Sequence, residues 1–491
     1  MAKREEAEHV VIFPFMAQGH ILPFLSLALH IEERFGFTVT FVNTPLNIKT
    51  LRPSLPPHST INLVSLPFSS SDHGLPPDSE NTHLLPYPLM SRLFHASLSL
   101  KPSFHNLLSH LIHLHGYPPI CIISDMFFGW TVDVAADLGI PHAIFNAGGA
   151  YGMAVYFSLW LNLPHLQSDS NEFSLPDFPE VSNIHLTQLS QFLMGADGTD
   201  DWSIFLQEQL SLSLKSDALL FNSVEALDQT GSNYFRRKFG GRVRTIGPIR
   251  TKLRQEKGGN QDFCLEWLNT HEPSSVIYVS FGSQNTISAS QMMQLAMGLE
   301  NSGKNFIWVV RPPIGFDMNL EFKAKDWLPE GFEDRMKETN RGLLVRKWAP
   351  QMEILSHRST CAFLSHCGWN SVMESLSHGV PIIGWPLAAE QFYNSKLLEE
   401  EVGVCVEVAR GTRCEISHEH VREVIELVMF DGENKRGKEM RRRACEAKEI
   451  LKDAIRDEEG YKGSSVRAMD EFFDMVLSMK TKTKFVGNGE V

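Results

Sequence analysis

The sequence predicts an α/β protein made of two doubly wound halves, each a parallel sheet with helices on both faces. A short apolar run over 9–15 is followed by a loop, by helical spacing of Leu and Ala over 21–34, and by a second strand-like run over 38–43. The same order of strand, loop, helix and strand restarts over 276–310. The length of 491 residues also exceeds what one hydrophobic core usually supports, so two domains are expected.

In the first half, the strand-like runs are short and alternate with helical stretches. The helix between the runs at 9–15 and 38–43 serves as a right-handed crossover between parallel strands. Further strand-like runs lie at 120–124, 143–146 and 218–222. Strands that alternate with helices in this way predict a doubly wound sheet.

A polar stretch separates the two halves. Residues 250–262 contain Lys, Arg, Gly, Gln and Asn with almost no large apolar side chains, which is typical of an exposed linker. After it, a strand is expected at 276–281, a helix at 290–301 and a strand at 306–310. The later strands of the second half are expected at 343–346, 361–364, 381–383 and 404–408.

Charge and composition exclude several classes of function. The formal net charge of -13 makes non-specific binding to nucleic acid or to an anionic membrane unfavourable, because either would repel most of the protein surface. The seven cysteines form no C-x-x-C pair, which argues against a disulfide framework and favours a reducing compartment. With neither a secretory segment nor an apolar run long enough to cross a bilayer, we expect a cytoplasmic protein without a membrane span.

The loops after the first strand of each half are the first places to seek a site, because open α/β sheets bind ligands outside the carboxyl ends of their strands. One of these loops holds Gly19 and His20, and the other holds Ser283. Neither contains G-x-G-x-x-G, so a nicotinamide or flavin oxidoreductase is disfavoured.

The most informative stretch runs from Trp348 to Gln391 and reads WAPQMEILSHRSTCAFLSHCGWNSVMESLSHGVPIIGWPLAAEQ. It closely resembles the signature box of the plant family 1 UDP-dependent glycosyltransferases. Its length of 44 residues, its two ends and its central HCGWNS run at 366–371 all agree with that box. The resemblance extends over nearly the whole chain and includes the residues at 19–20, 124–125 and 281–283.

This resemblance implies the GT-B fold, in which two Rossmann-like domains face each other across a cleft. The expected parts are an acceptor-binding domain at 1–250, a linker at 251–262, a UDP-sugar-binding domain at 263–460, and a C-terminal helix at 461–480 that packs back on the first domain. The expected partners are a UDP-sugar and a small-molecule acceptor, with no nucleic acid and no membrane, and the default expectation for the oligomeric state is a monomer.

A donor site without a metal ion follows from both the residues and the resemblance. A loop that ends at His366 and opens a helix near Asn370 and Ser371 offers N–H groups and a partial positive charge to a diphosphate. No two Asp residues are separated by a single residue, so the D-x-D arrangement by which metal-dependent glycosyltransferases hold a divalent ion is absent. UDP-glucose is therefore expected as co-substrate, with no metal and no other cofactor.

The resemblance also assigns the recognition of the nucleoside and the sugar. It implies that Trp348 stacks on uracil and that Gln351 and the Ala349 backbone pair with the base edge. It implies that Glu374 accepts the ribose hydroxyls, for which a carboxylate is suited because it offers only acceptors. It implies that Glu390 and Gln391 bind the sugar hydroxyls, and Gln391 as the final residue of the box favours glucose among plant members. The full candidate donor set is Gly19, Ser283, Trp348, Ala349, Gln351, His366, Trp369, Asn370, Ser371, Glu374, Glu390 and Gln391.

For catalysis, the resemblance points to His20 as general base and to Asp125 as its partner. An attacking hydroxyl must lose its proton, and an imidazole of near-neutral pKa suits that task. A carboxylate on the other ring nitrogen fixes the tautomer and stabilises the imidazolium. One direct displacement would then give a β-glucoside from an α-linked donor. Taken alone, a histidine after a strand is more often structural, and Asp125 could equally cap a helix.

The acceptor is the least determined part of the prediction, since its pocket comes from variable loops. A flavonoid or other phenolic of plant secondary metabolism is favoured, while terpenoids, hormones and existing glycosides stay open. Another UDP-sugar as donor and a non-catalytic UDP-sugar-binding protein are the alternatives. The candidate acceptor residues are Phe15, Met16, Phe127, Phe128, Asn146, Phe192 and Met194.

Overall fold

The structure, a computed structural model, divides into two compact units. The described residues are 8–249, 260–317, 320–346, 348–429 and 435–487. Of these described residues, the first unit comprises those within 8–183, 195–249 and 454–487, and the second comprises those within 184–194 and 260–453.

Two segments group differently from the ranges expected from the sequence. Residues 184–194 belong to the second unit and residues 454–460 to the first, whereas the sequence places each in the other half. The expected linker at 251–262 lies outside the described residues as far as residue 259, and helix α10 begins at Asn260.

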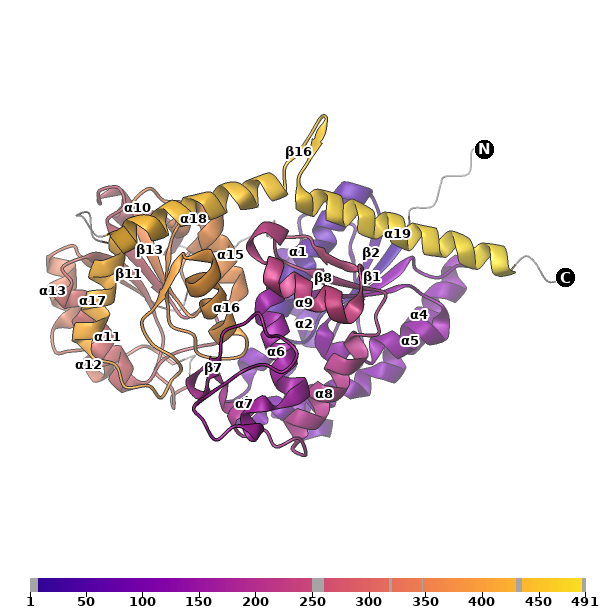
Figure 1. The fold of residues 1–491 in the computed structure, drawn as a ribbon, viewed down its shortest axis with the longest axis horizontal. Coiled ribbons are helices and arrows are strands. Elements are labelled where there is room, and N and C mark those ends of the chain that lie inside the picture. Colours follow the sequence, from indigo (N-terminus) through magenta and orange to yellow (C-terminus); the bar gives the residue numbers. More distant parts are fainter. Residues whose placement is uncertain (1–7, 250–259, 318–319, 347, 430–434, 488–491) are drawn as a thin grey trace. The chain divides into compact units, whose positions relative to one another are not determined.

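The first unit is built on a parallel sheet of seven strands in the order β3-β2-β1-β4-β5-β8-β9. Figure 1 labels β1, β2 and β8 of this sheet. The strands are β1 (His9–Phe13), β2 (Thr38–Asn43), β3 (Asn62–Ser65), β4 (Cys121–Ser124), β5 (His142–Asn146), β8 (Ala218–Phe221) and β9 (Val243–Thr245). The short strands β6 (Glu172–Phe173), β16 (Asp457–Glu458) and β17 (Tyr461–Lys462) lie outside this sheet. The helices are α1 (Gln18–Phe35), α2 (Pro45–Leu51), α3 (Met90–Ala96), α4 (Leu100–His115), α5 (Thr131–Leu138), α6 (Ala150–Asn162), α8 (Asp201–Ser213), α9 (Gln229–Phe239) and α19 (Ser464–Gly487).

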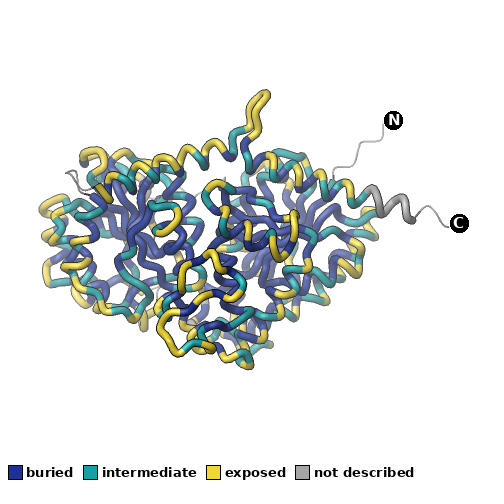
Figure 2. Tube along the Cα trace, in the orientation of Figure 1, coloured by how far each residue is buried: buried dark blue, intermediate teal, exposed yellow. Residues whose placement is uncertain are grey.

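The sequence explains the central elements of this unit. Every residue of β1 is buried, as expected for a parallel strand covered on both faces. Helix α1 ends where Gly36 adopts the left-handed conformation, which glycine reaches at little cost. Helix α19 packs on the same core, where the ring of Phe473 lies 4.6 Å from that of Phe35. In Figure 2 the strands of the sheet are buried beneath the helices.

The second unit contains a parallel sheet of six strands in the order β12-β11-β10-β13-β14-β15. The strands are β10 (Val276–Ser280), β11 (Asn305–Val310), β12 (Gly342–Arg346), β13 (Thr360–Ser365), β14 (Ile382–Gly384) and β15 (Cys405–Glu407). The remaining elements are β7 (Ile184–His185), α7 (Gln191–Met194), α10 (Asn260–Asn269), α11 (Ala289–Asn301), α12 (Ala324–Trp327), α13 (Phe332–Glu338), α14 (Gln351–Ser356), α15 (Trp369–His378), α16 (Gln391–Leu397), α17 (His418–Met429) and α18 (Lys435–Ala454). Alternate residues of β10 enter different cores, Ile277 one and Tyr278 the other, so both faces of the sheet are covered.

The prediction of two doubly wound parallel sheets is confirmed. Each sheet also reverses its strand order at the middle, between β1 and β4 in the first unit and between β10 and β13 in the second. Ligands of open α/β sheets bind at such reversals, outside the carboxyl ends of the strands. The loops that follow these four strands are therefore the places to examine. Over the part of the chain that the structure describes, no helix is long and apolar enough to cross a bilayer.

Candidate functional site

In the first unit, His20 and Asp125 meet at the reversal of the sheet. His20 lies near the start of α1 and Asp125 directly follows β4, and the register of β1 and β4 pairs Phe13 with Ser124. The His20 Nδ1 atom lies 2.6 Å from the Asp125 Oδ2 atom. The carboxylate is 1% exposed and the imidazole 27%, so a buried acid holds a ring that reaches solvent.

Backbone N–H groups fix the Asp125 carboxylate from the other side. Its Oδ2 atom accepts a hydrogen bond from the Phe15 N–H at 3.2 Å, and its Oδ1 atom accepts one from the Phe127 N–H at 3.1 Å. With donors on both oxygens, the carboxylate has little freedom to rotate away from His20. It therefore orients the imidazole and, when the ring is protonated, faces a positive charge.

Aromatic rings surround this pair. The Phe127 ring lies 5.4 Å from the imidazole centre, and the Phe15 ring lies 6.1 Å from it. Phe15, Met16 and Phe128 are fully buried, while Phe127 is 7% exposed. Of these predicted acceptor residues, only Phe127 therefore keeps some exposed surface. Its ring lies 5.2 Å from that of Phe15, which in turn lies 5.5 Å from that of Phe128.

The other three predicted acceptor residues are Asn146, Phe192 and Met194. Asn146 ends β5, is 3% exposed, and neither of its side-chain polar atoms has a hydrogen-bond partner among the described residues. Phe192 and Met194 lie on α7, which groups with the second unit, and Met194 is 59% exposed. The structure does not bring these two residues together with His20 within one unit.

In the second unit, His366 lies between two glycines at the reversal of the sheet. It follows β13, while Gly282 follows β10 and Gly368 immediately precedes α15. A Cβ atom built on Gly282 would lie 2.6 Å from the His366 Nε2 atom, and one built on Gly368 would lie 2.5 Å from it. Only glycine fits at either position, and the φ of 76° at Gly282 adds a second reason there.

Burial controls the charge of this histidine. Burial, together with the smaller effect of the positive charge of Arg311, lowers the pKa of His366 to about 4. The ring is therefore neutral at pH 7 and acts as a hydrogen-bonding group. Because α15 starts just after it, the N–H groups of the first helical turn and the helix dipole point toward the same place. This loop has the features of an anion-binding site.

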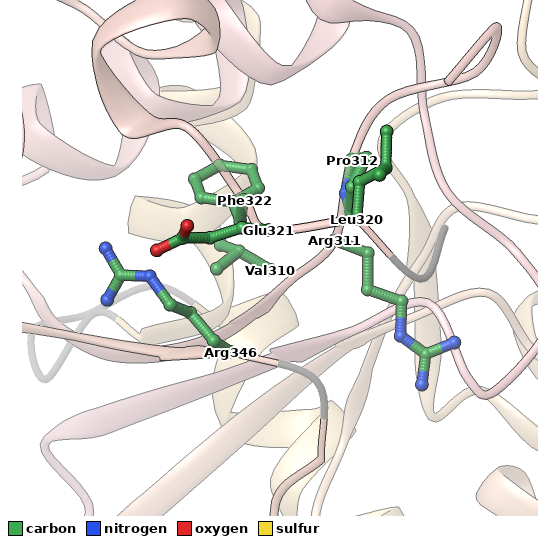
Figure 3. A pocket seen from close by; sticks show the side chains of 7 residues that line it. All are labelled: Val310, Arg311, Pro312, Leu320, Glu321, Phe322 and Arg346. Atoms are coloured by element: carbon green, nitrogen blue, oxygen red, sulfur yellow. The ribbon is translucent and has the colours of Figure 1, made fainter. Parts of the chain in front are cut away.

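Arg311 connects the Ser283 loop to the next strand of the sheet. It directly follows β11, and its Nη1 atom donates a hydrogen bond to the Ser283 carbonyl oxygen. A cavity of about 400 Å³ lies beside it at the carboxyl ends of β11 and β12. Figure 3 shows that the Arg311 side chain extends away from Glu321 and Phe322 in this cavity. The lining residues are Val310, Arg311, Pro312, Leu320, Glu321, Phe322 and Arg346.

Gln351, Glu374 and Ser371 of the predicted donor set form one polar cluster with Tyr278. The Gln351 Nε2 atom donates to Glu374 Oε2 at 2.6 Å and to Ser371 Oγ at 3.0 Å, while Gln351 Oε1 accepts from the Tyr278 hydroxyl at 3.3 Å. Burial raises the pKa of Glu374 above its ordinary value, and the bond from Gln351 opposes this rise. Asn370 lies one residue before Ser371 in the first turn of the same helix.

Trp348 and Ala349 precede this cluster along the chain. Trp348 is 46% exposed, which is unusual for so large an apolar side chain. Ala349 is 4% exposed and directly precedes Pro350, where α14 is capped. An exposed indole beside a buried polar cluster is an arrangement suited to a nucleobase and its ribose.

The end of the predicted box forms the start of α16. Gln391 Oε1 accepts hydrogen bonds from the N–H groups of Leu387 and Ala388 at 3.1 and 3.0 Å, so the side chain closes the preceding turn. Glu390 precedes it at the helix N-cap and is partly exposed. Trp369, the first residue of α15, is 5% exposed. Gln391 is therefore oriented by the backbone, with its carbonyl oxygen engaged.

Sequence reasoning missed three residues of this site, namely Gly282, Tyr278 and Arg311. Gly282 stood inside a quoted motif, but its role depends on contact with a histidine 84 positions away along the chain. Tyr278 lay within an apolar strand and was indistinguishable from a core residue. Arg311 carried a usable signal, because a charged residue that directly follows a buried strand lies at the ligand-binding edge of a parallel sheet.

Comparisons with known proteins agree with this geometry. A family model described as UDP-glucoronosyl and UDP-glucosyl transferase matches residues 181–441. The chain is 48% identical over 481 residues to UDP-glycosyltransferase 92A1 of Arabidopsis thaliana, with 96% of this chain and 98% of that protein covered. It is 47% identical over 442 residues to Crocetin glucosyltransferase 3 of Crocus sativus, with 85% and 91% covered.

A solved structure supports the same relationship at the level of the fold. The UGT73P12 structure of Glycyrrhiza uralensis, complexed with glycyrrhetinic acid 3-O-monoglucuronide, is similar with a TM-score of 0.83 and 29% sequence identity. The similarity covers 98% of both chains. It therefore includes both sheets and both candidate half-sites.

Proposed function

The chain belongs to plant family 1 of the UDP-glycosyltransferases, which transfer a sugar from a UDP-sugar to small acceptors, and from this we propose an inverting glucosyl transfer from UDP-glucose to a hydroxyl group. The proposed acceptor is a small hydrophobic molecule, with a flavonoid or other phenolic favoured. The observation that carries the proposal is the 2.6 Å contact between His20 Nδ1 and Asp125 Oδ2 at the reversal of the first sheet.

In the proposed step, His20 acts as general base on the acceptor. Its Nδ1 atom faces Asp125, so Nε2 is the nitrogen that takes the hydroxyl proton. The acceptor oxygen forms a bond to the anomeric carbon as the bond from that carbon to the phosphate oxygen breaks. Attack from the face opposite UDP inverts the anomeric centre, so an α-linked donor gives a β-linked product. The proton stays on His20 as an imidazolium that Asp125 stabilises.

The second unit would bind and stabilise UDP. The diphosphate accepts hydrogen bonds at the start of α15, near His366, Asn370 and Ser371, where the helix dipole favours negative charge. These neutral donors and the helix N-terminus would stabilise the diphosphate charge, which a divalent cation does in metal-dependent glycosyltransferases. We therefore propose a metal-independent reaction. Trp348 stacks on uracil, and the cluster of Gln351 and Glu374 binds the nucleoside.

Glucose is the proposed sugar for two reasons. Gln391 ends the box, and plant members with Gln at this place tend to use UDP-glucose. The name of the Crocus sativus relative also describes it as a glucosyltransferase. For the acceptor, the support is physical: the aromatic cluster of Phe15, Phe94 and Phe127 next to His20 favours a flat, apolar molecule.

Product analysis by mass spectrometry tests the proposal. Purified protein is mixed with UDP-glucose and a panel of phenolic and terpenoid acceptors, alongside His20→Ala. We expect the wild type to add one hexose to at least one acceptor, and His20→Ala to lose this activity by about 100- to 10,000-fold while UDP binding is kept. Competition with UDP-galactose, UDP-xylose and UDP-rhamnose measures the donor preference.

Three outcomes would contradict parts of the proposal. A wild type that binds UDP but transfers no sugar from any donor would support a non-catalytic binding protein. Activity that disappears in EDTA and returns with Mg²⁺ or Mn²⁺ would show that a metal ion is required. A product whose anomeric proton has the small coupling constant of an α-glucoside would exclude inversion.

A further inference from the structure

Cys367 has a backbone conformation that a non-glycine residue rarely adopts. Its φ is 61°, in the left-handed region, and it lies between His366 and Gly368 in the loop that opens α15. Such a conformation costs free energy for a residue with a Cβ atom and persists only where the surroundings hold it. The peptide groups around Cys367 set the direction of the N–H groups at the start of the helix, so what holds this residue also shapes the anion-binding loop.

Two side chains hold Cys367 in place. The Cys367 N–H donates to the Ser365 Oγ atom at 3.1 Å, and the Cys367 carbonyl accepts from the Asn394 Nδ2 atom at 3.0 Å. Ser365 is local, at the end of β13, but Asn394 comes from α16, 27 residues further along. The backbone of Cys367 is thus fixed at its N–H and at its carbonyl by residues of different elements.

Asn394 also reaches the residue proposed to bind the sugar. Its Nδ2 atom lies 3.5 Å from the Oε1 atom of Glu390, the N-cap residue of α16 four positions earlier. The same amide group therefore lies between the diphosphate loop and a carboxylate of the sugar site. Asn394 is fully buried.

We propose that Asn394 is a positioning residue that sets the diphosphate-binding loop and the sugar-binding carboxylate in one geometry. This inference rests on the proposed function, because it presumes that the loop at 366–368 binds the diphosphate of UDP. Asn394 acts through the Cys367 carbonyl and through Glu390.

The burial of Asn394 is poorly explained by stability alone. Its Oδ1 atom is buried and has no hydrogen-bond partner among the residues that the structure describes. A buried acceptor without a partner destabilises a fold, whereas an apolar side chain of similar size would pack at little cost. Its neighbours Phe392, Tyr393 and Leu397 on α16 are nearly fully buried, so the site tolerates apolar groups. The presence of an amide at this position is therefore best explained by the hydrogen bonds that its Nδ2 atom donates to the Cys367 carbonyl and to Glu390.

The test compares the affinities of UDP and uridine by isothermal titration calorimetry. Asn394→Ala removes the amide, and Asn394→Asp keeps its shape but removes the donor. We expect either variant to bind UDP about tenfold more weakly. Uridine affinity should change by less than about twofold, because Trp348 and Gln351 bind the nucleoside. A general loss of stability would weaken both ligands alike, so the ratio of the two affinities identifies the positioning role.

Ser359→Ala provides the matched control. Ser359 is fully buried at the amino end of β13, and its hydroxyl donates to the carbonyls of Leu268 at 3.1 Å and His271 at 2.8 Å. Its loss removes hydrogen bonds to backbone carbonyls in the same unit, but at the edge of the sheet opposite the loop. We expect it to lower the melting temperature without changing the ratio of UDP to uridine affinity.

A double variant tests the mechanism directly and remains useful if Asn394→Ala is unstable. Glycine adopts the left-handed conformation freely, so Cys367→Gly should reduce the need for Asn394. We expect Asn394→Ala to weaken UDP binding by less than about threefold in the Cys367→Gly background. An unchanged ratio of UDP to uridine affinity in both Asn394 variants would overturn the inference. Failure of the wild type itself to bind UDP would instead overturn the proposed function on which it rests.

Discussion

Replacing Asp125 by asparagine tests the proposed base with almost no change in shape. In the structure, the carboxylate accepts hydrogen bonds from two backbone N–H groups and faces His20 Nδ1 at 2.6 Å. An asparagine has one oxygen and one NH₂ group in place of two equivalent oxygens. It can therefore serve either the imidazole or the backbone donors well, but not all of them, and it carries no charge to stabilise an imidazolium.

The size of the effect follows from these contacts. A hydrogen bond to a charged group contributes about 1.5–3 kcal/mol. If this contribution is realised in the transition state, its loss lowers kcat by roughly 10- to 150-fold, at about 1.4 kcal/mol for each factor of ten. The backbone N–H group that loses its acceptor is buried, so the free energy of unfolding should also fall, by about 1–3 kcal/mol.

The assay measures kcat at saturating UDP-glucose below the melting temperature of the variant, with UDP affinity measured in parallel. Asp133→Asn serves as the control, because Asp133 on α5 is 47% exposed and its ion pair with Lys101 contributes little. A kcat for Asp125→Asn within about twofold of the control would refute the role of the carboxylate. A loss of UDP affinity in Asp125→Asn as large as the loss of kcat would also refute this role, because UDP is assigned to the second unit.

Three further predictions concern the second unit and the stability of both. Gly282→Ala should weaken UDP binding by at least about tenfold in titrations, because its Cβ atom would meet His366 Nε2 at 2.6 Å; Gly303→Ala, at a φ of 66° but 3.8 Å from its nearest neighbour, should not. Trp348→Ala should weaken the binding of both UDP and uridine by about 1–3 kcal/mol in the same titrations, because the indole could no longer stack on the base. Burial lowers the pKa of His142 to about 3 and of His366 to about 4, below the usual 6.5 of the unfolded chain, so protons bind the unfolded state first as the pH falls. The free energy of unfolding should therefore be fully retained above pH 6.5 and decrease from there to pH 4 in urea titrations, and a constant value across that range would contradict the assignment.

The fold was predictable because both sheets are parallel and buried on both faces. Such strands read as short apolar runs, and the expected runs at 143–146 and 361–364 correspond to β5 (His142–Asn146) and β13 (Thr360–Ser365). The first expected run, 9–15, extends too far, since β1 ends at Phe13 before Pro14. Strand order was not readable in the same way, because it depends on which helices pack on which face and not on local pattern.

Sequence reasoning named the candidate residues that belong to a recognised motif. It did not identify residues whose role depends on the register of neighbouring strands. The pairing of Ser280 with Ser365 brings the loops after β10 and β13 side by side, and only this register lets Gly282 contact His366. Asn394 lies three residues beyond the end of the recognised box, in a segment that reads as an ordinary buried helix. Its partner, the Cys367 carbonyl, is a backbone atom, and no sequence pattern reports where a carbonyl points.

In the proposed reaction, the two units would use the same position in the same kind of sheet for opposite electrostatic purposes. At the reversal of the first sheet, a buried carboxylate contacts the ring that would become positive. At the reversal of the second lie a neutral histidine, an arginine and a helix N-terminus, which would stabilise the diphosphate as it becomes more negative. Because the proposed base and the proposed donor site lie in different units, substitutions at Asp125 should lower kcat and leave UDP affinity unchanged. Substitutions at Gly282 or Asn394 should instead lower UDP affinity and leave kcat unchanged. Measuring both quantities for every variant therefore separates failure of the base from failure of the donor site, which activity alone would confuse.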